Sequence, residues 1–251
     1  MEWKDTGLLL SVRPHGEGSA IIEALTKDHG RHLGVVRGGS SRKMAPILQV
    51  GSVLSLEWRA RLQDHMGSFR AEPVKSHTHL MQDPLALSAL VSLCALLKIA
   101  LPEREAHPQM YARSLALIGA LQTDPLDWMA DYVRWEMVLL EELGFGLDLG
   151  RCAVTGSRED LIYVSPKSGR SVSRQGAGDW ADRLLPLSPL LLGQGRATLR
   201  DLQDGLRVTG HFLQRELAEH LHAGHLPEAR HRMVARMEKA LHGKLPPNST
   251  P

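Results

Sequence analysis

The residues of this sequence best suited to chemistry are cations that cluster in one stretch. Between His29 and Arg61 the chain carries six Arg and Lys residues against a single acid, Glu57. The whole chain of 251 residues, by contrast, has a net charge of only +2. Clustered cations bind nucleic acid mainly through its phosphates. The candidate nucleic-acid-binding residues are therefore Arg31, Arg37, Arg42, Lys43, Arg59 and Arg61.

Charge alone leaves a second interpretation open, in which these side chains are solvated charges on the surface of a small β domain. Aromatic residues that stack on bases usually accompany single-strand binding, and aromatics make up only 4% of this chain. Trp3, Trp58 and Phe69 are the ones close to the cluster. Trp58 alternates with Leu54 and Leu56, which predicts a place in the core. We therefore expect binding through phosphates, with little base stacking and little sequence preference.

The sequence offers little support for metal or catalytic chemistry. The two cysteines, Cys94 and Cys152, lie far apart and predict no disulfide framework. There is no HExxH motif, no phosphate-binding P-loop and no GxSxG motif. A metal-dependent enzyme could use only the late histidines, His211, His220, His222 and His225. We expect no enzymatic activity, no metal and no cofactor.

The cations belong to a region, residues 1–80, whose pattern predicts β structure. Apolar alternation predicts strands over residues 8–13, 19–26, 31–37, 53–61 and 67–72, with a short helix over 42–49. Five short strands with a helix between the third and fourth are typical of an OB-fold barrel. In the third strand, Arg31 and Arg37 fall on one face and His32 on the other. With Arg42 and Lys43 just beyond the glycine turn, they would form one phosphate-binding groove.

Helices with clear start signals follow from residue 81. Proline stands directly after Asp83, His107 and Asp124, which favours helices beginning at residues 84, 108 and 125. The first is expected to reach residue 100 and, being almost uncharged, to be buried in the core, with a groove for a partner's hydrophobic segment as the alternative. The third is expected to end at Gly144. Later helices are expected over residues 198–222, with Thr198 and Asp201 as a capping box, and over 228–241. Three acids of the third helix are expected on a solvated face: Glu136, Glu141 and Glu142.

Residues 147–178 interrupt the helical pattern with short strands and turns, in a segment of zinc-ribbon size. A ribbon needs four thiolates, and only Cys152 is present. The other three ligand positions hold Thr155, Ser173 and Gly176. The chain is therefore expected to be α+β, with a five-stranded OB-fold barrel (1–80), a helical domain (81–146 and 179–242), a degenerate zinc-ribbon-like insertion (147–178) and a disordered tail (243–251).

Four stretches of the chain share one resemblance: HGRHLGVVRGGSSRK, PEREAHPQMYARSLALI, YVRWEMVLLEELGFGLDLGRCAVTG and YVSPKSGRSVSR. The first looks like the loop-and-strand signature of the RecO family of bacterial recombination and DNA-repair proteins. The other three look like that family's helical and ribbon segments. The resemblance runs in the right order from the N-terminus to about residue 240, and ELGFGLDLGRCAVTG is its most specific part.

The resemblance implies an N-terminal OB-fold, a helical domain and an embedded zinc ribbon that some members have lost. It implies no enzymatic turnover, but binding of single- and double-stranded DNA and annealing of complementary strands. It also implies contact with the C-terminal tail of the single-strand-binding protein, and joint action with RecR, and in many bacteria RecF, in loading RecA. A cytoplasmic, nucleoid-associated location is expected. To the family's basic OB surface it assigns Arg31, Arg37, Arg42 and Lys43, while Arg59 and Arg61 rest on charge alone.

One alternative of another class stays open at this point: an OB-fold module that binds RNA or associates with the ribosome. Preference for structured RNA over single-stranded DNA would favour it.

Overall fold

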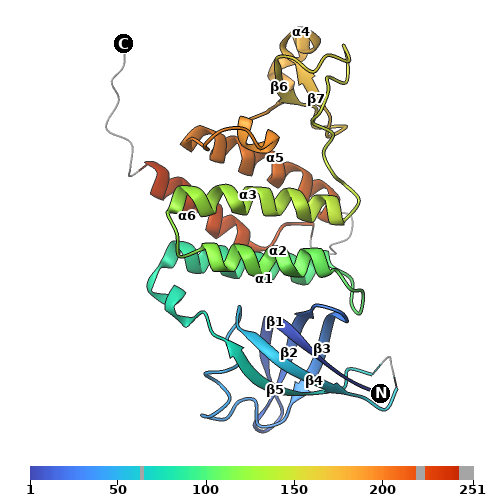
Figure 1. Ribbon diagram of the computed structural model, residues 1–251, viewed down its shortest axis with the longest axis vertical. Coiled ribbons are helices and arrows are strands. Elements are labelled where there is room, and N and C mark those ends of the chain that lie inside the picture. Colours follow the sequence, from blue (N-terminus) through green and yellow to red (C-terminus); the bar gives the residue numbers. More distant parts are fainter. Residues whose placement is uncertain (63–64, 219–223, 243–251) are drawn as a thin grey trace. The chain divides into compact units, whose positions relative to one another are not determined.

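The computed structural model of the chain describes residues 1–62, 65–218 and 224–242 (Figure 1). These residues form an α+β structure, as predicted, that divides into two compact units. Unit 1 holds residues 1–119 and 227–233, and unit 2 holds 120–226 and the residues from 234 onward. The domain boundary at residue 80 stays a prediction, and the predicted tail lies outside the described residues. No helix in the described part of the chain is long and apolar enough to span a membrane.

Unit 1 contains a closed barrel of five strands: β1 (Glu2–His15), β2 (Ser19–Thr26), β3 (Gly30–Val36), β4 (Val53–Arg59) and β5 (Ser68–Lys75). They pair in the order β1-β2-β3-β5-β4, and β4 returns to β1. The pair β3–β5 is parallel and the other pairs are antiparallel. This is the strand order of an OB-fold, so the predicted fold is confirmed.

The barrel core comes from the alternation seen in the sequence. In β4, Leu54, Leu56 and Trp58 are buried, and Trp58 is only 2% exposed, as predicted. A side chain at Gly34 would overlap the ring of Phe69, so the missing Cβ lets β5 close against β3. Each large apolar side chain buried in this way stabilises the fold by about 1.5–3 kcal/mol.

The prediction of a short helix between β3 and β4 is wrong, because residues 41–48 form successive turns instead. The Ala45 amide donates to the Ser41 carbonyl and the Leu48 amide to the Met44 carbonyl, both at 2.9 Å. Pro46 lies between them and has no N–H, which interrupts the ladder that a helix needs. Met44 and Ile47 nevertheless pack against the barrel core, so this 41–48 segment still covers it.

Unit 1 continues with η1 (Thr78–Gln82), α1 (Pro84–Ala100) and α2 (Pro108–Ala120). The Asp83 side chain caps α1 by accepting from the amides of Leu85 and Ala86, as the sequence predicts. α1 buries most of its length, as expected for a nearly uncharged helix, and it packs on β1. Burial raises the pKa of the Cys94 thiol on this helix to about 12.

Unit 2 is built on α3 (Pro125–Glu142) and α5 (Leu199–Ala218), which pack together. α3 ends before Gly144, whose positive φ of 85° confirms its predicted role. Thr198 and Asp201 cap α5 reciprocally, again as predicted. α5 is described to Ala218, and residues 219–223, which include His220 and His222, lie outside the described part. The last helix, α6, spans Glu228–His242, so its residues up to Met233 are counted in unit 1 and the rest in unit 2.

The remainder of unit 2 is short-stranded. Strands β6 (Leu161–Val164), β7 (Ser171–Ser173) and β8 (Leu185–Pro186) form a sheet in the order β7-β6-β8. Three brief helical turns accompany it: α4 (Arg174–Ala177), η2 (Gly178–Arg183) and η3 (Pro189–Leu192). Ribbon-like character for this segment stays a prediction.

The solvated position expected for Glu136 is wrong. Its side chain is fully buried between α3 and α5, and its carboxylate accepts a hydrogen bond of 2.5 Å from the Thr209 hydroxyl. Glu141, on the same helix, is exposed as expected. Glu136 is therefore part of the polar core of unit 2.

Candidate nucleic-acid interface

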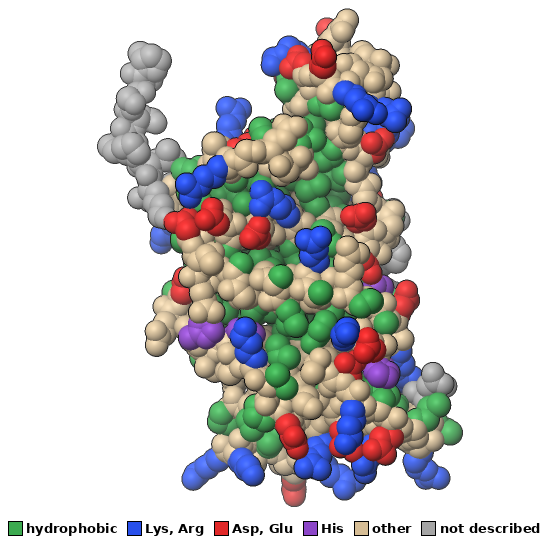
Figure 2. All heavy atoms as spheres, in the orientation of Figure 1, with side chains coloured by type: hydrophobic (Ala, Val, Ile, Leu, Met, Phe, Trp, Pro, Cys, Tyr) green, Lys and Arg blue, Asp and Glu red, His purple; other side chains and the backbone are tan. Residues whose placement is uncertain are grey.

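A groove of about 730 Å³ opens on the barrel where β3 ends, beside the 41–48 segment and strands β4 and β5. Its apolar lining includes Met44, Ile47 and Phe69. Its charged lining consists of Arg37, Lys43, Arg59, Arg70, Glu57 and Glu72. In the space-filling view, Lys and Arg side chains gather along the lower edge of the barrel, with acids among them (Figure 2). The groove therefore combines several cations with an apolar floor.

Three of the six predicted residues, Arg37, Lys43 and Arg59, line this groove. Arg42 is exposed next to Lys43 but does not line the groove, and Arg61 is exposed just beyond β4. Arg70 is a lining cation that the sequence reasoning missed. Its signal was present, because β5 alternates buried Phe69 and Ala71 with exposed Arg70.

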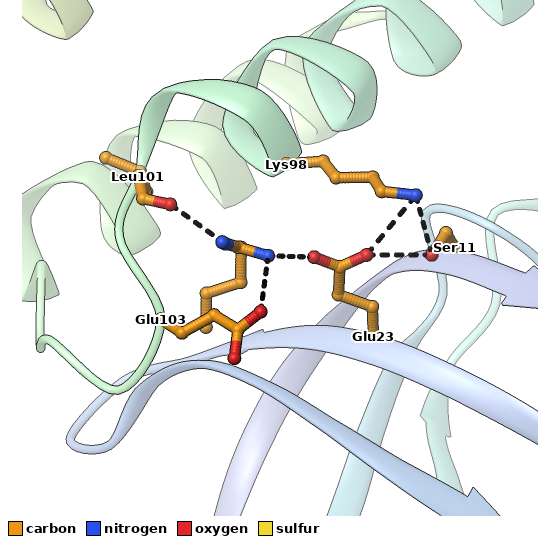
Figure 3. Close-up of polar contacts among 6 residues, drawn as sticks. Ser11, Glu23, Lys98, Leu101 and Glu103 are labelled. Carbon is orange, nitrogen blue, oxygen red and sulfur yellow. Dashed lines mark hydrogen bonds and ion pairs between the residues drawn. The ribbon is translucent and has the colours of Figure 1, made fainter. Parts of the chain in front are cut away.

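Arg31 lies at the other end of β3 from Arg37. With about 3.3 Å per residue, the six steps between them span roughly 20 Å. Arg31 forms an ion pair with Glu23, its Nε donates to the Leu101 carbonyl at 2.9 Å, and its side chain is 14% exposed (Figure 3). The expectation of one continuous basic surface from Arg31 to Lys43 is thereby corrected.

The buried carboxylate of Glu23 holds the Arg31 side chain at its end of β3. The Glu23 side chain is only 3% exposed, and besides Arg31 it contacts Lys98 of α1 at 3.4 Å and the Ser11 hydroxyl at 3.0 Å (Figure 3). A buried carboxylate needs such partners, because burial of an unpaired charge is costly. Arg31 thus connects the barrel with the segment that follows α1.

The cations of the groove differ in how they are paired. On the β3 side, Arg37 and Lys43 form no ion pair with any residue that the structure describes. On the β4–β5 side, Arg59 pairs with Glu2 at 2.9 Å and also with Glu57. Arg70 pairs with Glu72 at 3.1 Å. The β3 side therefore offers the cations that are available to an incoming phosphate.

The pKa values of one pair reflect its contacts. Hydrogen bonding and charge from Glu57, together with Glu2, raise the pKa of the Arg59 guanidinium. Desolvation by itself raises the pKa of Glu57. The hydrogen bond from Arg59 and the charges of Arg59 and Lys4 outweigh this effect and leave that pKa below its usual value. Glu57 is thus a carboxylate at neutral pH.

The aromatic residues near the groove pack on one another. Trp3 stacks on His29 with ring centroids 4.3 Å apart and on Trp58 at 5.6 Å, and His32 meets the edges of both indoles. The Trp58 indole also donates to the Met66 carbonyl at 3.0 Å. Their faces are occupied within the barrel, which agrees with binding through phosphates.

The four predicted ribbon positions converge in unit 2. The Cys152 sulfur accepts from the amide and the hydroxyl of Ser173 at 3.2 and 3.3 Å, and from the Thr155 amide at 3.4 Å. A Cβ added at Gly176 would lie 2.8 Å from that sulfur. Desolvation alone raises the pKa of the Cys152 thiol. Hydrogen bonds from Ser173 and Thr155 outweigh this effect and lower that pKa to about 6.

These residues do not fit a structural zinc ion. Zinc requires four nitrogen, sulfur or carboxylate ligands, and this cluster supplies one thiolate, two hydroxyls and a glycine. The Thr155 and Ser173 hydroxyl oxygens instead contact each other at 3.5 Å. Nowhere in the described ranges do three His, Cys, Asp or Glu side chains gather in a way that could hold a metal.

A closed β1-β2-β3-β5-β4 barrel followed by helices defines an OB-fold protein with a helical C-terminal region. The chain matches the family model described as Recombination protein O N terminal over residues 1–77, and the one described as Recombination protein O C terminal over residues 81–225. The chain therefore belongs to the RecO family. The family gives it a role in DNA repair and recombination.

Curated proteins of that name cover nearly the whole chain. A DNA repair protein RecO from Cereibacter sphaeroides (strain ATCC 17029) is 59% identical over 240 residues, which is 96% of this chain and 100% of that protein. The DNA repair protein RecO of Jannaschia sp. (strain CCS1) is 54% identical over 240 residues, which is 95% of this chain and 97% of the relative. That of Roseobacter denitrificans is 54% identical over 242 residues, with 96% and 100% covered.

Proposed function

We propose that this chain is a non-enzymatic DNA-repair mediator that binds single- and double-stranded DNA through the groove of its barrel and anneals complementary strands. The observation that carries the proposal is the groove itself, where Arg37 and Lys43 have no acid partner in the described structure. Arg42, exposed beside them, extends the same cationic surface. Arg59, Arg61 and Arg70 are its further members, and Arg31 is excluded because it is held by Glu23.

The physical chemistry of the groove suits annealing. Two complementary strands repel each other until their phosphate charge is neutralised. Cations that contact phosphates carry no sequence information and leave base edges free to pair. The aromatic rings of Trp3 and Trp58, which stack on each other, do not compete for those bases.

The family membership supports a set of partners. We propose that the chain works in the cytoplasm at nucleoid DNA with RecR, and with RecF as in many bacteria, to load RecA onto DNA coated by single-strand-binding protein. Contact with the C-terminal tail of that protein would bring the chain to its substrate. A pull-down with the full-length single-strand-binding protein and with a version lacking its last residues tests this contact. Equal capture of both versions would contradict it.

The DNA-binding proposal is tested with Arg37→Glu combined with Lys43→Glu. We expect this variant to lose most of its affinity for a single-stranded oligonucleotide and its annealing activity. The matched control is Arg13→Glu with Lys27→Glu, which changes the charge equally at exposed barrel positions outside the groove lining. Equal losses of affinity in the two variants would contradict the groove as the DNA-binding site. A preference for structured RNA over single-stranded DNA in competition would favour an RNA-binding module instead.

A further inference from the structure

Arg59 is the cation of the groove that two acids of the chain, Glu2 and Glu57, hold together. Strands β1 and β4 place Glu2 opposite Arg59 and Lys4 opposite Glu57, so that opposite charges face each other. Arg59 contacts Glu2 at 2.9 Å and forms a second ion pair with Glu57. Glu57 lines the groove, and its side chain is only 13% exposed.

We propose that Glu57 is an internal competitor of phosphate, which occupies Arg59 and thereby limits the affinity of the groove for nucleic acid. A carboxylate and a phosphate each offer an arginine two oxygens that accept its paired hydrogen bonds. A strand that gains Arg59 must displace Glu57, whose largely buried carboxylate is then left with Lys4 alone, at 3.5 Å. The gain from the new phosphate contact is offset by that loss. This inference rests on the proposed function of the groove.

The pair Arg70–Glu72 in the same groove provides the contrast. Its side chains are 75% and 61% exposed, and ion pairs in water contribute little. Phosphate therefore displaces Glu72 with little cost, whereas Glu57 resists displacement. Strands would then be held mainly by Arg37 and Lys43 and exchange readily, as the pairing of two strands requires.

The test compares Glu57→Gln with Glu72→Gln in the full chain, using oligothymidylate as the probe. Both variants remove one negative charge from the same groove. We expect Glu57→Gln to raise affinity about three- to tenfold and to steepen the dependence of log affinity on log salt by about 0.7, the increment for one more phosphate of a single strand. Glu72→Gln should give a clearly smaller gain. Equal gains would show an effect of charge alone and overturn the proposal.

A second variant assigns the gain to Arg59. Adding Arg59→Ala to Glu57→Gln should abolish the increase in affinity, and persistence of the increase would overturn the proposal. If Glu57→Gln does not fold, Glu57→Asp takes its place, because it keeps the charge and draws the carboxylate back from Arg59 by one methylene. A lack of any gain in affinity in folded Glu57→Asp then counts against the proposal. If only this inference is wrong, the variant Arg37→Glu with Lys43→Glu still loses its affinity for DNA. If the proposed function is wrong, that variant keeps its affinity.

Discussion

Arg31 and Glu23 form an ion pair in which neither side chain is more than 14% exposed. Lys98 and Ser11 complete the surroundings of the Glu23 carboxylate. The pair separates two kinds of cation on one strand: Arg31 stabilises the fold, and Arg37, at the far end, is available to a ligand.

Arg31→Ala should therefore destabilise the protein and leave DNA binding unchanged. Removal of one partner leaves a buried carboxylate poorly compensated, which costs about 3 kcal/mol of unfolding free energy. Arg37→Ala is the reciprocal control, with unchanged stability and weakened binding. Denaturant unfolding and oligonucleotide titration measure the two quantities. A tenfold loss of affinity in folded Arg31→Ala, with normal stability, would return Arg31 to the binding surface.

Gly30→Ala should be strongly destabilising. Gly30 has a φ of +70°, and an added Cβ would overlap the backbone of Glu105. Backbone strain costs roughly 1–3 kcal/mol and the steric overlap adds to it. Gly38→Ala is the matched control, since Gly38 has a φ of +68° but open space around it. Equal losses of unfolding free energy would show that the contact with Glu105 is unimportant.

Stability should fall in mild acid because of His32. Burial, aided by the nearby charges of Arg104 and His29, lowers the pKa of His32 from 6.5 to about 4. Between pH 6.5 and about 4, the unfolded chain binds a proton at His32 that the folded chain does not bind. The free energy of unfolding therefore falls as the pH is lowered from about 6.5 towards 4. His32→Phe, which keeps an aromatic ring beside Trp3 and Trp58, should flatten the pH dependence of unfolding free energy over this range. An unchanged profile in this variant would assign the effect to other groups.

Thr209→Val should destabilise unit 2 by about 1–3 kcal/mol, because the isosteric change removes the hydroxyl that donates to buried Glu136. Thr123→Val removes an exposed hydroxyl bond to Ala120 and serves as the control. Thermal and denaturant unfolding compare the two variants. A loss no larger than that of the control would mean that Glu136 does not depend on Thr209.

The periodicity of the sequence predicts the elements of the fold well. β2 begins and ends at the predicted residues, and α1 and α3 begin where proline follows Asp83 and Asp124. These features succeed because alternation and capping are local properties of the chain. The helix over residues 42–49 failed for an equally local reason, the missing amide hydrogen of Pro46.

The pairing of charges was beyond the reach of sequence patterns. Glu23 lies opposite Leu33 in the β2–β3 register, and only the folded hairpin and α1 bring Arg31 and Lys98 to it. Glu136 is a similar case, since its partner Thr209 lies 73 residues away. Alternation in β5 does expose Arg70, so this residue was within reach of the same reasoning that found Arg59.

The salt dependence of oligonucleotide binding is the sharpest test of Arg37 and Lys43 as the phosphate contacts of the groove. If Arg37 and Lys43 each neutralise one phosphate, Arg37→Ala with Lys43→Ala should reduce the slope of log affinity against log salt by about 1.4 relative to the unsubstituted chain. Arg31→Ala should leave that slope as it is. An unchanged slope in the double variant, measured on folded protein, would contradict the account of this groove as the phosphate-binding site.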